Sequence, residues 1–298
     1  KQKTAYEIGV RLVGSEMCIR DRAMTATPIP RTLAFTIHGD MEISIIDELP
    51  KSRIPIITKV VEPSRMDRVY DFIRKEMMAG RQCFVVYPLI EESEKMDLKA
   101  AETGFEQLRD GVFSNFKLGH IHGRMKKDER DAQMEAMARN EIQCLIATTV
   151  IEVGINIPNA TVMVIENAER FGLTQLHQLR GRIGRGKDQG YCVLVQHKNS
   201  PDSNHRLKVM ESTSNGFKIS DEDLKLRGPG EFFGTRQHGF IRSKLANFVE
   251  DGQIIRLARS RALQLVSEDP NLQGTGHKAI RTQFIKHYQH MLEFTNIS

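Results

Sequence analysis

The sequence has neither a long apolar run nor closely spaced cysteines. No stretch approaches the about 20 apolar residues that cross a bilayer, so we expect no membrane partner. Residues 1–22 carry scattered charges without a continuous apolar core, which argues against a signal peptide. No two cysteines have the C-x-x-C spacing of a zinc site. Three lie in apolar runs, as reduced core thiols of a cytoplasmic protein do; the four are Cys18, Cys83, Cys144 and Cys192.

Charge is close to balanced, with a small basic excess. Lys and Arg number 43 against 38 Asp and Glu, which gives a net charge of +5 and a pI near 9.0. This excess is compatible with a polyanionic partner without requiring one. Hydrophobic residues make up 40% of the chain and charged residues 27%, which indicates a globular protein rather than disorder. At about 100–200 residues per domain, the length predicts two domains.

From residue 54, short apolar runs alternate with segments of helical periodicity. This pattern predicts an α/β fold, a parallel sheet with helices on both faces. Ligands of such sheets bind beyond the carboxyl ends of the strands, here the loops after Tyr87, Val150 and Asn167. The predicted strands are 54–61, 83–90, 118–123, 144–150, 161–167 and 191–197, and the predicted helices are 66–77, with Ser64 as N-cap, 100–109, 128–139 and 173–182.

After about residue 200 the strand pattern stops. Residues 205–226 are predicted to be helical, with Ser220 and Asp223 in a capping-box pattern. Three glycines and a proline in nine residues predict a structured loop at Arg227–Thr235. The remaining expected elements are an amphipathic helix over 245–265, stopped by Pro270, and a tail helix over 280–292.

The most informative segment is QLHQLRGRIGRG, residues 175–186. Its three arginines, Arg180, Arg182 and Arg185, cannot all pack on one apolar helix face, and its glycines let the backbone turn tightly. A guanidinium offers a fork of donors that matches a phosphate, and two of them can stabilise charge on a transferred γ-phosphoryl group. A solvated basic helix end would explain an isolated R-x-R but not the whole string.

This string resembles motif VI of the superfamily 2 helicases. LIATTVIEVGINIPNA at 145–160 resembles motif V, and MTATPIPRTLA at 24–34 resembles motif III. The segments 84–94 and 121–125 stand in the motif IV region. The resemblance implies the second RecA-like lobe of a helicase.

The segment at 214–239, SNGFKISDEDLKLRGPGEFFGTRQHG, narrows the branch. It resembles the translocation element shared by RecG-like helicases and transcription-repair coupling factors. The linker at 39–53 and the EESE at 91–94 favour the RecG branch. The resemblance, from about residue 24 to residue 270, implies an ATP-dependent DNA helicase that uses Mg²⁺ and remodels branched or stalled-fork DNA in recombination and repair.

The resemblance also implies roles for individual residues. In motif VI, the catalytic group would be Gln178, Arg182 and Arg185, which reach a nucleotide held between two lobes. Asn156 stands where many relatives carry an aspartate that binds the ribose, and it can still accept a hydrogen bond. The other implied roles are nucleotide binding by Gly154, Asn156, Arg182 and Arg185, motif III coupling by Thr25, Ala26 and Thr27, and DNA contact or translocation by His122, Arg124, Thr148, Thr149, Arg227, Arg236 and Gln237.

Two strings that an ATPase of this class needs are missing. Neither a G-x-x-x-x-G-K-[S/T] phosphate loop nor an acidic DExH-type string occurs in the 298 residues. We therefore expect the isolated chain to be inactive, as the C-terminal portion of a helicase without its first RecA-like lobe and wedge domain. The expected division is a foreign or unstructured segment at 1–22, a first-lobe remnant with motif III and linker at 23–52, the second lobe at 53–200, the translocation element and long helix at 201–270, and a tail helix at 271–298.

Other interpretations of the sequence stay open. A non-catalytic DNA-binding or interaction module would need only this lobe, and a fragment of a transcription-repair coupling translocase would share its motifs. Residues 205–226 alone would favour a small docking subdomain packed under the α/β core. His120 and His122 share one face of a strand, but no carboxylate or cysteine is spaced to complete a metal site, so we expect no metal. The sequence leaves the oligomeric state undetermined, and we expect a monomer.

Overall fold

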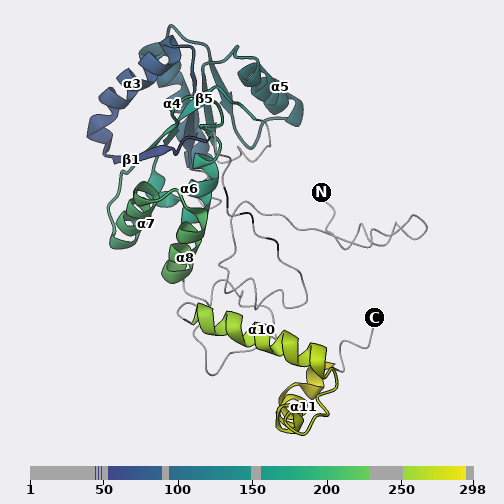
Figure 1. The fold of residues 1–298 in the computed structure, drawn as a ribbon. Helices are drawn as coiled ribbons and strands as arrows, with labels where there is room; N and C mark the ends of the chain where they lie inside the picture. Colours follow the sequence, from purple (N-terminus) through teal and green to yellow (C-terminus); the bar gives the residue numbers. More distant parts are fainter. Residues whose placement is uncertain are drawn as a thin grey trace, which may run out of the picture.

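The computed structural model of the chain describes residues 53–88, 94–148, 156–227 and 251–292, together with residues 44, 46 and 48. Within these residues, six strands form one parallel sheet in the order β1-β6-β5-β2-β4-β3 (Figure 1). This confirms the predicted RecA-like α/β fold class. The strands are β1 (Ile57–Val61), β2 (Gln82–Tyr87), β3 (Leu118–Ile121), β4 (Cys144–Thr148), β5 (Ala160–Ile165) and β6 (Tyr191–Val195).

Helices connect the strands and continue after the last one. Each predicted helix of the α/β region is present with bounds shifted by a few residues, because helix ends depend on contacts that periodicity does not reveal. The observed helices are η1 (Pro63–Arg65), α3 (Met66–Met78), α4 (Glu94–Gln107) with η3 (Leu108–Val112), α5 (Lys127–Ala138), η4 (Ala168–Arg170), α6 (Leu173–Arg180), α7 (Pro201–Ser212), α8 (Gly216–Arg227), α10 (Gly252–Glu268) and α11 (Lys278–Leu292).

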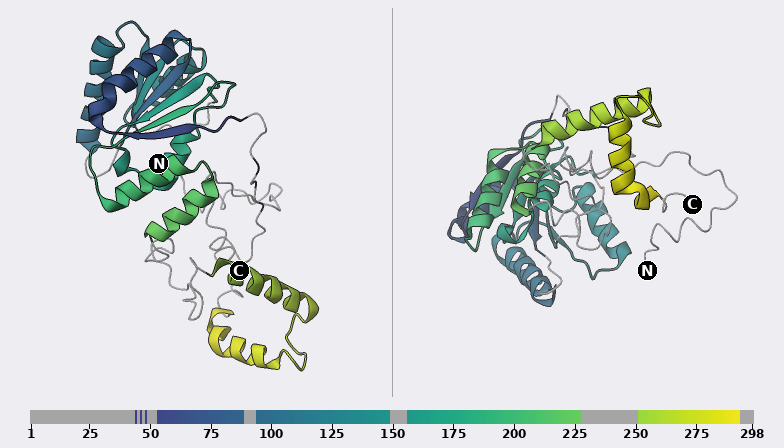
Figure 2. Two further views of the ribbon diagram at one scale, coloured as in Figure 1. Left: turned by 60° about the vertical axis from the view of Figure 1, so that its left-hand side comes forward. Right: turned by 90° about the horizontal axis from the view of Figure 1, so that it is seen from below.

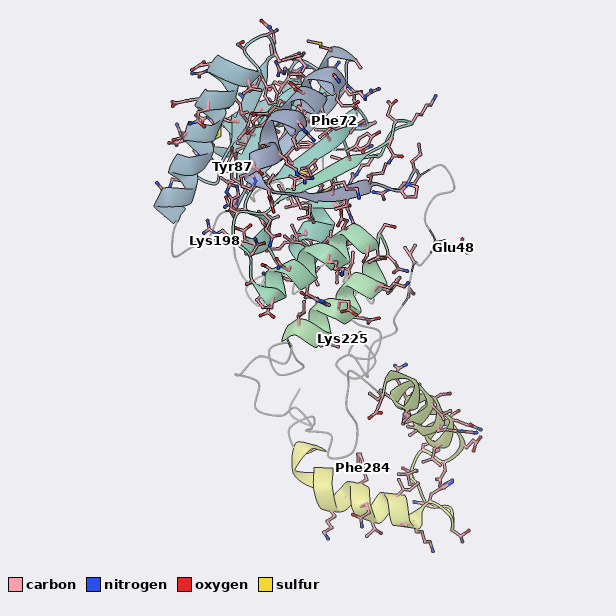
Figure 3. All side chains as sticks on the ribbon, turned by 90° about the vertical axis from the view of Figure 1, so that its left-hand side faces the viewer. Glu48, Phe72, Tyr87, Lys198, Lys225 and Phe284 are labelled. Carbon is pink, nitrogen blue, oxygen red and sulfur yellow. The ribbon has the colours of Figure 1, made fainter. Side chains whose placement is uncertain are left out.

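Helices cover both faces of the sheet. Because successive strand residues point to opposite faces, each strand contributes side chains to two cores. In β2, Cys83 and Val85 join one core cluster, which α3 and η3 cover. Phe84 and Val86 join the other cluster, which α5, α6, α7 and α8 cover. Figure 2 shows this layering from two further sides. On the α3 face, the ring of Phe72 meets that of Tyr191 on β6 edge-on, with centroids 5.0 Å apart (Figure 3).

Two predicted helix caps are wrong. Ser64 lies inside the short helix η1, and α3 begins only at Met66. The region 205–226 contains two helices, α7 and α8, so Ser220 and Asp223 lie inside α8 rather than at its start. The side chain that caps α8 is Asn215, whose Oδ1 accepts from the backbone N–H of Phe217 at 2.9 Å. Asn is a preferred N-cap residue for this reason.

The turn between α10 and α11 is built around one carboxylate. Asp269 accepts hydrogen bonds from the backbone N–H groups of Gly274 and Gln273 and from Nδ1 of His277, at 2.8, 3.0 and 2.8 Å. These bonds favour the ionised carboxyl, and they lower the pKa of Asp269 to about 2. Pro270, which was predicted to stop the preceding helix, lies within this turn, and α10 ends at Glu268.

The described cysteines are buried and unpaired, as the apolar runs around them predicted. They are Cys83, Cys144 and Cys192. Cys18 lies outside the described residues. In the parts of the chain that the structure describes, no helix combines the length and the apolar character needed to span a bilayer.

Two adjacent methionines in the last turn of α3 give a matched test of the core. Met77 is 3% exposed and Met78 is 74% exposed. We expect Met77→Ala to lower the free energy of unfolding by about 2–5 kcal/mol, because it leaves a cavity under the sheet. Met78→Ala should change it by less than about 0.5 kcal/mol. Urea unfolding of both variants measures the difference, and equal effects would contradict this packing of α3.

Candidate functional site

The arginine string lies at the amino-terminal edge of the sheet. Helix α6 returns from the carboxyl end of β5, so the residues after it lead into β6. Asn156 precedes β5 and Arg53 precedes β1, and these three strands are neighbours in the sheet. Because the strands are parallel, the segments that precede them meet at one edge. The prediction that chemistry lies beyond the carboxyl ends of the strands is therefore wrong for these arginines.

Arg185 is held at this edge by two neutral oxygens. Its Nε donates to the carbonyl oxygen of Gly181 at 3.1 Å, and an Nη donates to Oδ1 of Asn156 at 3.4 Å. Burial, followed by the like charges of Arg182 and Arg53, lowers the pKa of Arg185. The structure therefore brings Arg182, Arg185 and Asn156 together. Several guanidiniums in one place form a site suited to a phosphate.

The glycines after α6 permit this close arrangement. A Cβ on Gly186 would lie 2.5 Å from the carbonyl oxygen of Pro158, next to the segment that carries Asn156. Gly184 has a φ of +63° and donates its N–H to the carbonyl oxygen of Ala160 at 3.0 Å. Only glycine adopts that backbone conformation without strain. The glycines thus join the motif VI loop to the end of motif V.

Gln178, the remaining residue of the predicted catalytic group, is exposed on α6. Arg182 is half-buried just after the helix ends at Arg180. The opposite, inner face of α6 contacts the helices α7 and α8.

That inner face packs on the α7–α8 hairpin. Thr174, His177 and Arg180 are spaced by three residues, which places them on one side of a helix. Thr174 Oγ1 donates to Oδ2 of Asp223, in α8, at 3.1 Å. A Cβ on Gly216, the first residue of α8, would lie 2.9 Å from Nε2 of His177. Close packing at the start of α8 therefore requires glycine there.

Arg180 is the buried centre of this contact. Its side chain is 3% exposed, and one Nη donates to the carbonyl oxygens of Met210 and Thr213 at 2.8 and 2.9 Å. The same nitrogen lies 3.3 Å from Oγ1 of Thr58 on β1. Arg180 thus binds the end of α7 and the first strand to α6. The sequence had placed Arg180 only within the phosphate-binding string, although its spacing from Thr174 was a signal of this role.

His177 stays neutral beside Arg180. Burial, then the charges of Arg180 and Arg53, lowers the pKa of His177 to about 4. An Nη of Arg180 lies 3.2 Å from Nδ1 of His177. Because a guanidinium only donates, Nδ1 accepts and the imidazole proton belongs on Nε2.

Three of the predicted DNA contacts lie at the opposite, carboxyl edge of the sheet. Thr148 ends β4 and is fully buried, and His122 follows the neighbouring strand β3. Within the described ranges, neither Thr148 Oγ1 nor His122 Nδ1 has a hydrogen-bond partner. Arg124 is exposed in the turn after β3. The structure thus places these three predicted residues at one end of two adjacent strands.

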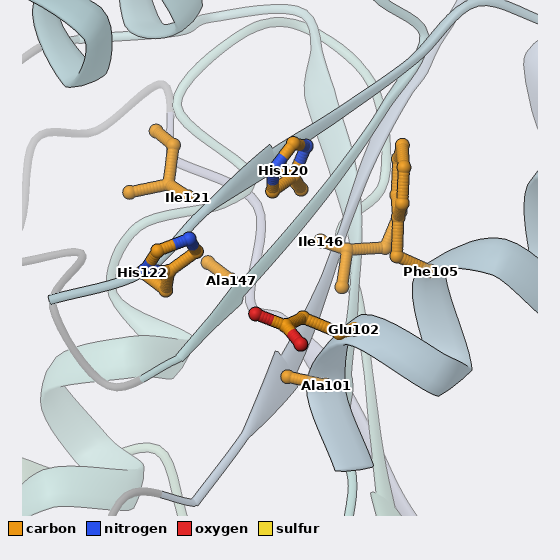
Figure 4. Close-up of a pocket in the computed structure, with 8 residues that line it drawn as sticks. All are labelled: Ala101, Glu102, Phe105, His120, Ile121, His122, Ile146 and Ala147. Atoms are coloured by element: carbon orange, nitrogen blue, oxygen red, sulfur yellow. The ribbon is translucent and has the colours of Figure 1, made fainter. Parts of the chain in front are cut away.

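A small cavity lies beside His122 (Figure 4). The rings of His120 and His122 stack with centroids 5.9 Å apart, and Phe105 covers His120 at 4.6 Å. Burial, and then the neighbouring His122, lowers the pKa of His120. Glu102 also lines the cavity. Among the described residues, no group of three or more His, Cys, Asp or Glu side chains is placed to hold a metal ion.

The structure describes several other predicted site residues only in part or not at all. The backbone of Arg227 is described as the last residue of α8. The others lie outside the described residues, and they are Thr25, Ala26, Thr27, Thr149, Gly154, Arg236 and Gln237.

Two protein families match the chain. The helicase conserved C-terminal domain matches residues 64–187. The family described as ATP-dependent DNA helicase RecG, domain 3, C-terminal, matches residues 213–298.

Individual relatives extend the match across most of the chain. The ATP-dependent DNA helicase RecG of Synechocystis sp. is 50% identical over 270 residues, 91% of this chain and 32% of that protein. The Bacillus subtilis protein of the same name is 44% identical over 263 residues, 88% of this chain and 39% of that protein. A solved structure of RecG bound to a three-way DNA junction is 43% identical, with a TM-score of 0.62 over 79% of this chain and 32% of the solved chain. The chain thus spans about a third to two fifths of the length of these relatives.

The two faces of α6 give a matched pair of variants. Arg180→Ala removes the donor of buried carbonyl oxygens, so we expect it to lower the free energy of unfolding by about 3 kcal/mol or more. Gln178→Ala, on the exposed face, should change it by less than about 0.5 kcal/mol. Chemical denaturation measures both. Arg180→Met keeps much of the volume without the donors, so full stability in Arg180→Met would contradict the importance of these hydrogen bonds.

Proposed function

This chain is homologous to the C-terminal part of proteins named ATP-dependent DNA helicase RecG, and from that premise we propose that it supplies the second motor lobe and the translocation element of such a helicase. One observation carries the proposal. Arg182 and Arg185 converge with Asn156 at the amino-terminal edge of the sheet, so two guanidiniums lie close together there.

The nucleotide site is a half-site. Its donors, the guanidiniums of Arg182 and Arg185, fit the phosphate chain of ATP, and Asn156 offers an oxygen to a ribose hydroxyl. Gln178 and Gly154 complete the proposed set. The residues present do not fit Mg²⁺, because the sequence has no phosphate-loop hydroxyl and no acidic DExH-type string. Those groups belong to a first lobe that closes on this edge, and Thr25, Ala26 and Thr27 couple that closure to the nucleotide state.

DNA binds at the other edge. The exposed guanidinium of Arg124 suits a backbone phosphate. Thr148 and His122 lie at the same edge, and each has a buried polar atom without a partner within the described residues. Thr149 follows Thr148 in motif V and shares its role. The loop beyond α8 adds Arg227, Arg236 and Gln237 to the translocating surface.

Helix α6 connects the proposed nucleotide site to the α7–α8 hairpin. Its C-terminal end carries the arginines of the nucleotide site, and its inner face holds the α7–α8 hairpin through Arg180, His177 and Thr174. A shift of α6 on nucleotide turnover therefore moves the hairpin as well. The proposed lobe covers residues 53–200 and the proposed translocation element 201–270. Separate family matches at 64–187 and 213–298 support a division near residue 200.

The proposed substrate is branched or forked DNA. Support comes from the similar RecG, whose structure was solved on a three-way DNA junction. The first RecA-like lobe is the proposed protein partner, and ATP with Mg²⁺ the proposed cofactor of the assembled motor.

The isolated chain should not hydrolyse ATP. A phosphate-release assay, with and without forked DNA, measures turnover, and we expect none above a no-protein blank because the phosphate loop is missing. Turnover that persists through purification and disappears in Arg185→Gln would overturn the half-site proposal.

The isolated chain should bind forked DNA, with an affinity that falls steeply as salt rises. Arg124→Ala should weaken binding several-fold and reduce the slope of log affinity against log salt by about 1, since one phosphate contact is lost. Arg74→Ala is the matched control, because Arg74 lies on α3 in an ion pair with Asp71. Fluorescence anisotropy gives both slopes, and equal slopes for the two variants would place the DNA elsewhere.

A further inference from the structure

Arg53 lies near Arg182 and Arg185 but belongs to the segment before β1, outside motif VI. It precedes β1, which lies beside β6 at the edge of the sheet. The segment behind it is bonded at two points to residues 189–190, which lie between motif VI and β6. Gln189 Nε2 donates to the carbonyl oxygen of Pro55 at 2.7 Å, and the N–H of Ile57 donates to that of Gly190 at 2.9 Å. The position of Arg53 is therefore tied to the loop.

Apolar packing strengthens this connection. Cγ1 of Ile56 lies 3.1 Å from the place that a Cβ would take on either Gly184 or Gly190. Both glycines are thus needed for the side chain of Ile56 to rest on the loop. Because Arg53 lies only three residues before Ile56, the packing of Ile56 also restricts the position of Arg53.

Arg53 and Arg185 share one acceptor. An Nη of Arg53 lies 3.5 Å from the carbonyl oxygen of Gly181, which also accepts from Arg185 Nε at 3.1 Å. Gly181 is the C-cap of α6, where the helix dipole concentrates negative partial charge. A helix end carries only about half an elementary charge, so it cannot neutralise two cations.

The nearest charges that act on Arg185 are those of other arginines. The pKa of Arg185 is lowered by burial and by the charges of Arg182 and Arg53. Arg81, which forms an ion pair with Glu76, shows the opposite behaviour, with its pKa raised. A guanidinium beside a carboxylate behaves as Arg81 does, and Arg185 does not.

We propose that Arg53 is a third guanidinium of the nucleotide half-site, which positions Arg185 through their shared contact with Gly181 and adds its own charge to the binding of a polyphosphate anion. The proposal rests on the proposed function, since the anion is there the phosphate chain of a nucleotide. Arg53 contacts the carbonyl oxygen of Gly181 and makes the site more positive before any ligand arrives.

The first test needs no ligand. Because the charge of Arg53 helps to keep the pKa of His177 near 4, Arg53→Gln should raise that pKa, measured by NMR titration of the imidazole Cε1–H. Arg53→Lys keeps the charge and should leave the pKa low. Arg65→Gln, an exposed arginine in η1, is the matched control and should have no effect. An unchanged His177 pKa in Arg53→Gln would overturn the placement of Arg53.

The second test measures pyrophosphate binding to the same proteins by calorimetry, with sulfate at equal ionic strength as the competing anion. Arg53→Gln should weaken binding about tenfold, and Arg53→Lys should recover only part of it, because an ammonium lacks the planar fork. Loss of binding in Arg185→Gln but not in Arg53→Gln would overturn this inference alone. Unchanged binding in both Arg182→Gln and Arg185→Gln would overturn the half-site itself. No pyrophosphate binding by the wild type, or binding no tighter than that of sulfate, would overturn the anion-binding role of Arg53.

Discussion

The buried guanidinium of Arg180 holds three parts of the fold in register. It donates to the carbonyl oxygens at the end of α7 and lies against Thr58 on β1, while the segment just after its own helix carries Arg182 and Arg185 of the proposed nucleotide half-site. A charge this deeply buried is stable only when its donors are used. The contact therefore fixes where α6 ends, and with it the positions of Gly181, Arg182 and Arg185. Neutral His177 beside Arg180 avoids a second buried charge in the same place.

The parallel sheet separates two kinds of chemistry. The segments that precede β1 and β6 bring Arg53, Arg182 and Arg185 to one edge, where the segment before β5 adds Asn156, while the carboxyl ends of β3 and β4 lie at the edge of the proposed DNA surface. Helix α6 runs from the carboxyl edge to the amino-terminal edge on one face of the sheet. This arrangement suits a motor, because a displacement at the nucleotide reaches the α7–α8 hairpin through a rigid element rather than a loop.

The sequence predicted what depends on local pattern. Apolar runs identified the six strands of the described residues, since the central strands β2, β4 and β5 are almost entirely buried. The roles of Arg182 and Arg185 in motif VI stay predictions. Contacts distant in sequence could not be predicted. The capping-box pattern of Ser220 and Asp223 failed because Asp223 is used inside α8 to bind Thr174, 49 residues away. Arg53 was missed because its partner, Gly181, lies 128 residues further along the chain.

The most direct measurement uses a chimera in which this chain replaces the matching 270 residues of the Synechocystis RecG, to which it is 50% identical. ATP-dependent unwinding of a three-way DNA junction would be compared with that of the same chimera carrying Arg185→Gln. If this chain is a second motor lobe, the chimera unwinds the junction. The Arg185→Gln chimera should then bind the junction equally well but lose on the order of 10³-fold in ATP turnover. A chimera that folds, binds the junction and turns over ATP equally fast with and without Arg185 would contradict the assignment.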